Sequence, residues 1–493
     1  MHFIRVLLLT AVCAAGVPAA AAPVAPEGAA LEVRLLQAVA SYSSRAGAPL
    51  EARVVAPLRV DERTLIPIGS VVRGELAEVH KLGLGIRRGR ASLRFRFDTL
   101  ELPDGTTFPL AARVTSIDTA RETVSPGGQV LGIRATSAFG HRMAGITRNL
   151  FFWDPLVHSV LTGATVATLR FPEAEIHFPA GTELRLTLTE PLQLREDWTV
   201  PLPTIATTPE ERKALAEIVR DMTYRSLTAG SLREADLINV VLLGDKEWVR
   251  RAFAAAGWVE AHRLTKATGW ATFRSVAESK AYPEAPMSAQ LLDELPPAIA
   301  LSKALNTYSK RHHARVWTLP DEFRGRPVFA LAATEDTAID FSFKRMRLIH
   351  TIDPNLDNER AKVINDLVDA GCVDAAELIE RPWAPREFTN ATGEKIFTDA
   401  RLLVIELNPC RTARIADGAG QPALRITGRW YQRIPRQVIL TLRNDFTHNN
   451  PLVQATLGVR YLIGKTGGNE RRRARPARSG SEVLSIAPAA AAK

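Results

Sequence analysis

Hydrophobic and polar residues alternate along residues 30–200, which is the pattern of β-strands with one buried face. In residues 93–97, Leu, Phe and Phe alternate with Arg and Arg, and Pro103-Asp104-Gly105 then supplies a hairpin turn. Several short strands separated by turns are typical of a barrel or a sandwich. We therefore predict an all-β barrel or sandwich domain over residues 22–200.

A proline-glycine motif occurs twice in this part of the chain. Ile66-Pro67-Ile68-Gly69-Ser70 and Phe178-Pro179-Ala180-Gly181-Thr182 each turn the chain into an alternating strand. Between them lies a more helical stretch with the cluster Leu150-Phe151-Phe152-Trp153. Large aromatic residues are usually buried, so we interpret this cluster as a core plug; an exposed contact patch is the alternative.

Residues 201–235 contain one strong helix signal. Thr208-Pro209-Glu210-Glu211 is a capping box with proline at the first helical position. The apolar residues that follow fall on one helical face: Leu215, Ile218, Val219 and Met222. We predict an amphipathic helix that links two domains and packs between them.

Helical and strand patterns are mixed in residues 236–410. We predict strands at residues 237–243, 313–319, 328–333 and 346–350, and helices at residues 245–256 and 265–279 and from Asp353 to Gly371. Consecutive strands argue against a doubly wound sheet and favour an α+β domain. The predicted fold is thus multi-domain: the β barrel or sandwich, then this α+β domain, then a β-rich C-terminal extension over residues 411–464.

The two ends of the chain have their own composition. Residues 1–21 combine Arg5, a short apolar run and a cluster of alanines, which is the pattern of a cleaved signal peptide, with a retained N-terminal anchor as the alternative. We expect a periplasmic protein that is soluble or peripheral to a membrane. Residues 465–493 carry seven basic and two acidic side chains, and we expect a disordered basic tail. Because much of the net charge of +10 lies there, we expect no nucleic-acid partner.

The predicted mature chain has two cysteines, Cys372 and Cys410. Residues 373–379 and 402–407 both have strand patterns, and antiparallel pairing would bring the two thiols together. An oxidising periplasm permits the bond, so we predict a disulfide, with two buried free thiols as the alternative.

Polar residues that can perform chemistry gather in one region, although common catalytic motifs such as His-Glu-x-x-His and Gly-x-Ser-x-Gly do not occur. Histidine and carboxylate sets can bind a metal such as Zn²⁺ and activate water, and arginines can hold an anionic substrate. The alternative is a structural role: Asp353 has the position of a helix N-cap, and adjacent His312 and His313 point to opposite faces of a strand. The catalytic candidates are His312, His313, Asp336, His350, Asp353, Arg311 and Arg315, and the metal-ligand candidates are His313, Asp336 and His350. No cofactor is assigned.

Seven ordered stretches of residues 236–408 carry a resemblance to a known family: residues 238–244, 252–258, 311–317, 333–336, 350–354, 357–360 and 397–402. In these stretches the chain resembles the C-terminal domain of LssY. Thr351 stands where the family often has a second histidine, and Ala400 where it often has glycine. The resemblance implies an envelope-associated accessory domain linked to secretion or lipid handling. Some relatives carry a membrane phosphatase domain, but the sequence blocks of that domain do not occur here.

Residues 50–195 resemble the outer β-barrel domain of the scaffold subunit of type IV secretion and conjugation machines. Together these features favour a non-enzymatic binding or scaffold protein whose partner is an envelope protein or a membrane surface. The cluster Leu150–Trp153 and the tail Arg471–Arg478 are the contact candidates. The alternative function is a metal-dependent hydrolase of a phosphoester or a lipid. The residue pattern leaves open whether the chain is an enzyme and which small molecule it would take.

Overall fold

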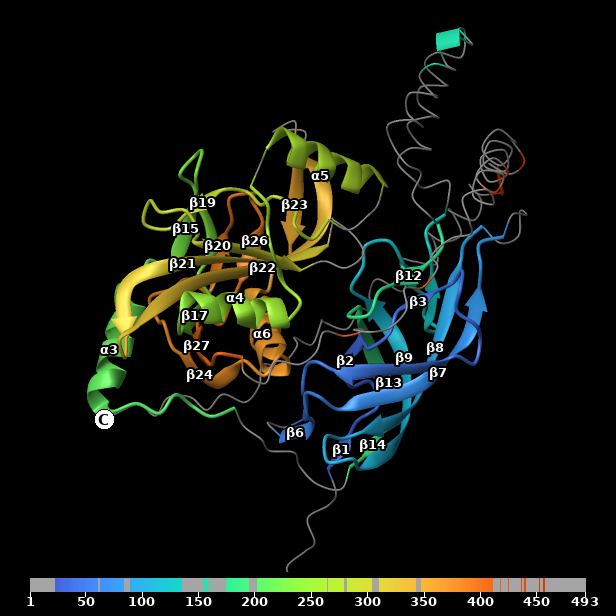
Figure 1. The fold of residues 1–493 in the computed structure, drawn as a ribbon, viewed down its shortest axis with the longest axis horizontal. Helices are drawn as coiled ribbons and strands as arrows, with labels where there is room; N and C mark the ends of the chain where they lie inside the picture. Colours follow the sequence, from blue (N-terminus) through green and yellow to red (C-terminus); the bar gives the residue numbers. More distant parts are fainter. Residues whose placement is uncertain are drawn as a thin grey trace, which may run out of the picture.

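The computed structural model describes two β-rich bodies side by side (Figure 1). The described residues are 23–60, 63–83, 89–134, 174–194, 202–263, 265–278, 282–303, 310–342 and 347–410, with single positions between 154 and 160 and between 417 and 456. The predicted signal peptide, the cluster Leu150–Trp153 and the basic tail lie outside these residues, as does the predicted β extension apart from single positions.

The N-terminal body is a closed β-barrel, which decides between the two predicted architectures. Each barrel strand pairs antiparallel with its neighbours, and β8 also pairs with β9 to close the ring. Small strand pairs, such as β1 (Val24–Ala25) with β14 (Leu192–Gln193), lie at its ends. In ring order the strands are β8 (Ser92–Glu101), β7 (Val71–His80), β4 (Pro49–Val54), β2 (Ala30–Leu35), β13 (Glu183–Leu188) and β9 (Thr107–Ile117).

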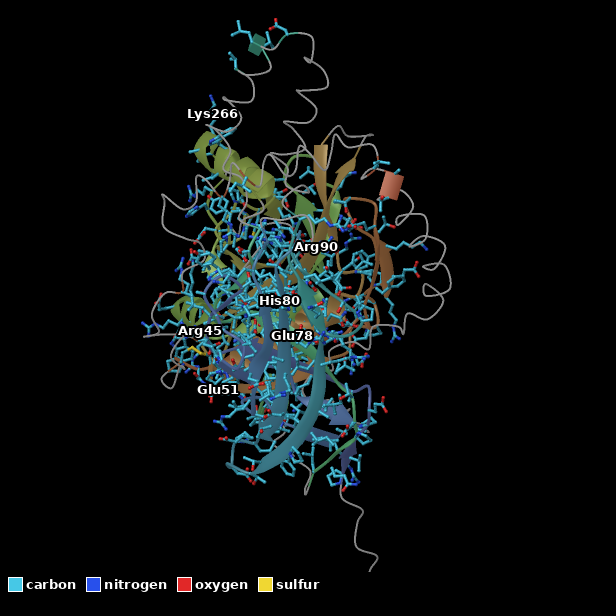
Figure 2. The ribbon with its side chains drawn as sticks, turned by 90° about the vertical axis from the view of Figure 1, so that its right-hand side faces the viewer. Arg45, Glu51, Glu78, His80, Arg90 and Lys266 are labelled. Atoms are coloured by element: carbon cyan, nitrogen blue, oxygen red, sulfur yellow. A yellow bond between two sulfur atoms is a disulfide. The ribbon has the colours of Figure 1, made fainter. Side chains whose placement is uncertain are left out.

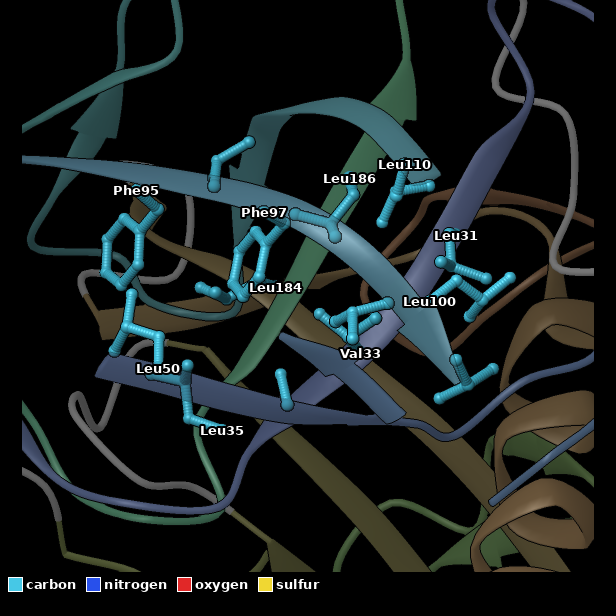
Figure 3. Close-up of a cluster of buried hydrophobic side chains, with 14 of the residues drawn as sticks. Leu31, Val33, Leu35, Leu50, Phe95, Phe97, Leu100, Leu110, Leu184 and Leu186 are labelled. Carbon is cyan, nitrogen blue, oxygen red and sulfur yellow. The ribbon is translucent and has the colours of Figure 1, made fainter. Parts of the chain in front are cut away.

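Along the barrel strands, apolar side chains that fill the interior alternate with charged side chains on the outer surface. Leu31, Val33, Phe95 and Phe97 point inward and are buried (Figure 3), and the two phenylalanine rings stack with centroids 6.3 Å apart. Burying a side chain of this size contributes about 1.5–3 kcal/mol. Outward positions carry ion pairs instead, such as Arg73 with Glu51 and Arg94 with Glu78. The side chains of Glu51, Glu78 and His80 are labelled in Figure 2.

The repeated proline-glycine motif makes the same turn twice. Gly69 and Gly181 have φ angles of +89° and +90°, which only glycine adopts without strain. In each turn the N–H of the following residue, Ser70 or Thr182, donates to the proline carbonyl, and its hydroxyl donates to the same oxygen at 2.8 or 2.7 Å. The predicted Leu-Pro-Asp-Gly hairpin between β8 and β9 is also confirmed, with Gly105 at φ +86°.

The second body is a mixed sheet with helices on both faces. All described pairings are antiparallel except β17 with β27, and β23 (Arg347–Ile352) branches from β22. Helices α4 (Lys246–Ala255) and α6 (Leu356–Asp369) cover one face. The α+β prediction is thus confirmed. The strand order is β18 (Val259–Glu260), β20 (Ile299–Lys303), β21 (Arg311–Phe323), β22 (Arg326–Ser342), β17 (Val240–Leu243), β27 (Leu402–Leu407) and β24 (Val373–Ile379).

Helix α3 (Pro209–Asp221) has the predicted capping box, in which Thr208 Oγ1 accepts from the Glu211 N–H at 3.2 Å. Its apolar face packs on the sheet face opposite α4 and α6, against Val241 and Trp317. The helix therefore covers the second body rather than lying between two domains. Residues after it form further strands, β15 (Arg225–Thr228) and β16 (Glu234–Leu237), and β15 also pairs with β19 (Gln290–Leu291).

Two local predictions were wrong because side chains compete with the backbone. The predicted strand 237–243 breaks at Asn239, whose amide donates to the Ala333 carbonyl and accepts from the Ala333 N–H, both at 3.0 Å. Helix α6 begins after Asn355, which accepts from the Asp357 N–H, so Asp353 is not the cap. Asp353 instead accepts from the N–H of Asn355 and the amide of Asn358.

The remaining helix, α5 (Lys266–Glu278), and the hairpin of β25 (Glu387–Thr389) with β26 (Lys395–Phe397) lie outside the main sheet. The predicted disulfide is present: Cys372 is bonded to Cys410, and β24 and β27 pair antiparallel with Val373 opposite Leu407. Of the helices in the described part of the chain, none has the length and apolar character needed to cross a membrane.

Candidate ligand site between the two domains

Asp366 on α6 is the centre of a buried ion network that joins the barrel to the second body. Its carboxylate accepts from Arg34 of barrel strand β2 at 2.6 Å, from Lys303 of β20 at 2.9 Å and from Lys362 at 2.5 Å. The indole N–H of Trp258 donates to the same group at 2.9 Å. A carboxylate shared by three cations and an indole is fixed in position.

The barrel contributes a second carboxylate to this network, that of Glu183 on β13. Glu183 lies 2.8 Å from Arg34, 3.0 Å from Lys362 and 3.4 Å from Lys303. Arg34 also pairs with Asp369 at 3.0 Å. Because each side of the boundary carries both charge signs, breaking the contact would leave buried charges unpaired on both domains.

These contacts shift the titration of the network. Burial raises the pKa of Asp366, but Lys303, Lys362 and Arg34 outweigh it and hold that pKa well below 3.8. In the same way, Lys362, Lys303 and Arg34 hold the pKa of Glu183 well below 4.5. Burial lowers the pKa of Lys303 to about 8.

We predict that the protein loses stability on acidification as these carboxylates titrate. The folded-state pKa values of Asp366 and Glu183 lie below the unfolded values, so their contribution is complete above about pH 4.5 and is lost as the pH falls below it. Urea unfolding at pH 7 and pH 3 should differ by on the order of 3 kcal/mol or more for such groups. Equal stability at the two pH values would show that the network is not formed in solution.

A cavity of about 700 Å³ lies beside this network and is walled by both domains. Its walls are strongly charged, with both signs present. The barrel contributes Glu32, Arg113, Ser116, Asp118, Glu183 and Arg185, and the second domain contributes Lys310, His312, Glu335, Asp353, Glu359 and Lys362.

His312 connects the two walls of this interdomain cavity. Its Nδ1 lies 2.9 Å from Glu359 Oε2, and its Nε2 lies 3.3 Å from Asp118 Oδ2 on the barrel. Lys310 pairs with Asp118 at 2.8 Å. Burial alone would lower the pKa of His312, but the charge of Glu359 and the bond to Asp118 raise it well above 6.5.

A second cavity, of about 580 Å³, lies within the second domain. Here His313 Nε2 and Asp336 Oδ2 lie 2.6 Å apart, and burial lowers the pKa of His313 to about 4. The neutral imidazole therefore donates to Asp336. Arg315 is held by Asp236 at 2.7 Å, and Arg311 lines the same cavity.

The candidate residues found in the sequence are thus divided between the two cavities. His312 and Asp353 line the interdomain cavity. The side chain of His350, on β23, lies outside the described ones. The alternation of a strand explains the division, because His312 and His313 are neighbours on β21 and point to opposite faces. The second cavity holds Arg311, His313, Arg315 and Asp336.

Two glutamates that the sequence reading missed complete the interdomain cavity. Glu335 lies directly opposite His312 in the β21–β22 register, and Glu359 lies in the first turns of α6. Within the described part of the chain, His312, Glu335 and Glu359 bring ligand atoms within 4.8 Å of one another. Strand pairing could have identified Glu335, because a glutamate directly opposite a histidine in a β-hairpin lies on the same face of the sheet as that histidine. Asp118 and Glu183 could not be found this way, since they come from the other domain.

The fold and the site define a two-domain, β-rich protein with a charged cavity at the domain boundary. The second domain can be described further: residues 219–402 match the family model described as the LssY C-terminus. This match does not include the barrel residues, so the resemblance of the barrel to type IV secretion scaffolds stays a prediction. A search of curated proteins gives no match.

Proposed function

We propose that this chain is a periplasmic accessory protein that acts by binding rather than by catalysis, and that the interdomain cavity is its ligand site. The observation that carries the proposal is the cavity itself: both domains wall it, and the ion pairs Lys310–Asp118 and Lys362–Glu183 cross the boundary and hold its charged side chains in place. Ligand sites occur preferentially at domain interfaces and are usually preformed. A network that fixes the two domains supports such a preformed site.

The charge of the walls indicates the kind of ligand. Arg185 pairs with Glu32 at 2.5 Å, Lys362 pairs with Glu183 at 3.0 Å, and Arg113 lines the same cavity. An apolar lipid tail would desolvate these charged groups, whereas a small polar molecule with charged groups could hydrogen-bond to them. The link to secretion or lipid handling that the LssY resemblance implies would then act through this polar ligand or through an envelope partner.

The metal-dependent hydrolase is not the function that we propose. Such a hydrolase would use His313, Asp336 and His350 as metal ligands, with His312 and Asp353 among its catalytic residues. His313 and Asp336 line one cavity, while His312 and Asp353 line the other. A hydrolytic site needs its ligands and its general base around one reacting atom.

Native mass spectrometry of the protein purified gently from the periplasm tests the proposal. We expect the polypeptide mass to lack residues 1–21 and a small organic molecule to be retained. Ser116→Trp should lose that molecule, because an indole at this cavity position would fill the space. Asp98→Trp, at an exposed position on β8, is the matched control and should retain it.

Two results would overturn the proposal. A mass that includes residues 1–21 would contradict export with cleavage. A wild-type spectrum with the polypeptide mass and inorganic ions alone would contradict ligand binding.

A further inference from the structure

We infer that the interdomain cavity also holds a divalent transition-metal ion, bound by His312, Glu335 and Glu359. This inference goes beyond the proposed function, because it requires no organic ligand. His312 and Glu335 come from paired positions on β21 and β22, and Glu359 comes from α6. Two paired strands and the helix α6 therefore direct one imidazole and two carboxylates toward a common point.

The geometry fits a metal of the size of Zn²⁺ or Mn²⁺. Zinc ligands lie at about 2.0–2.2 Å from the ion, so two of them at the tetrahedral angle are about 3.3–3.6 Å apart. The ligand atoms of the three residues lie within 4.8 Å of one another, so no pair has to close by more than about 1.5 Å when an ion binds. His312 Nδ1 and Glu359 Oε2 lie 2.9 Å apart, so the imidazole and this carboxylate already face each other.

An unpartnered atom at the same place independently indicates a cation. Glu359 is 2 % exposed, and its Oε1 is buried without a hydrogen-bond partner among the described residues. Buried carboxylate oxygens are nearly always satisfied by a donor, a water molecule or an ion. A metal ion bound to this oxygen would satisfy it, and leaving a buried polar atom unpaired is costly.

The surroundings of His312 are those of a metal-binding histidine. When Nδ1 binds a metal, Nε2 carries the proton and needs an acceptor, and Asp118 Oδ2 lies 3.3 Å from it. A carboxylate that orients the imidazole in this way is the usual second partner of a metal-bound histidine. Because Asp118 belongs to the barrel, the site is complete only when both domains are in contact.

Charge balance and ligand type select the ion. Asp118, Glu335 and Glu359 converge on this corner of the cavity, where Lys310 is the cation that faces Asp118 and Glu335. A divalent ion that replaces the Nδ1 proton, and so leaves His312 neutral, would balance these charges. Imidazole with carboxylate favours Zn²⁺ or Mn²⁺ over Mg²⁺ or Ca²⁺, which prefer oxygen ligands alone.

The test is equilibrium dialysis of the chelator-treated full mature chain against ZnCl₂, MnCl₂ and MgCl₂, read by elemental analysis. We expect about one equivalent of Zn²⁺ or Mn²⁺ and much weaker Mg²⁺ binding. Glu359→Gln should weaken binding at least about tenfold, and Asp118→Asn by about 10- to 100-fold. Glu247→Gln, on the exposed face of α4, should bind as the wild type does.

Asp118→Asn keeps the test decisive if Glu359→Gln does not fold, since Asp118 is not itself a ligand. Wild-type protein that binds neither Zn²⁺ nor Mn²⁺, or folded variants that bind as the wild type does, would overturn the inference. A bound metal without a retained organic molecule would refute ligand binding alone and leave the metal site standing.

Discussion

Replacing Asp366 with asparagine is expected to lower the free energy of unfolding by about 3–5 kcal/mol. The variant keeps nearly the same shape but removes the charge that Arg34, Lys303 and Lys362 share. Glu183 can compensate only part of it, because it already pairs with the same three cations. Breaking a buried ion network by removing one partner is costly because the remaining charges stay desolvated.

Urea unfolding of Asp366→Asn and wild type at pH 7 measures this effect. Asp221→Asn is the matched control, because Asp221 pairs with Arg220 at the exposed end of α3. The control should change stability by less than about 0.5 kcal/mol. If both variants had the same small effect, the interdomain network would contribute nothing to stability.

Loss of the disulfide is expected to have an effect of similar size. Cys372 and Cys410 are 38 residues apart, and a bond that closes such a loop stabilises the protein by about 4 kcal/mol in the chain-entropy model. The bond connects the start of β24 to the end of β27, so its removal frees the edge of the central sheet. Cys410→Ser should therefore unfold at a clearly lower urea concentration than oxidised wild type.

The control for this variant is the reductant itself. Reduced wild type should unfold like Cys410→Ser, and the variant should not respond to reductant. A wild type that is equally stable with and without reductant would mean that the bond is absent or does not constrain the chain.

Features governed by local chemistry could be predicted from the sequence. Turns of the barrel occur at Gly69, Gly105 and Gly181, because each turn needs a residue with a positive φ and glycine adopts it without strain. The capping box at Thr208 gives the start of α3. The pairing of the two cysteines follows from the antiparallel strands that flank them.

Features governed by distant contacts could not be predicted. Asn239 interrupts a hydrophobic run because its side chain replaces the backbone pairing with Ala333. One local feature was also predicted wrongly: Asp353 has the sequence position of a cap, but Asn355 makes the capping bond. At the site, strand alternation separates His312 from His313, whereas the approach of Asp118 to His312 depends on how the two domains pack.

We conclude that the barrel and the domain that matches the LssY C-terminus form one body around a shared cavity. Spin labels at Arg96→Cys on β8 and Arg251→Cys on α4 would report the separation of the domains by electron double resonance, since both side chains are exposed. We expect one narrow distance distribution in the otherwise unchanged chain and a broad one when Asp366→Asn is added. A broad distribution without that substitution would contradict the claim, because the cavity would then not be preformed.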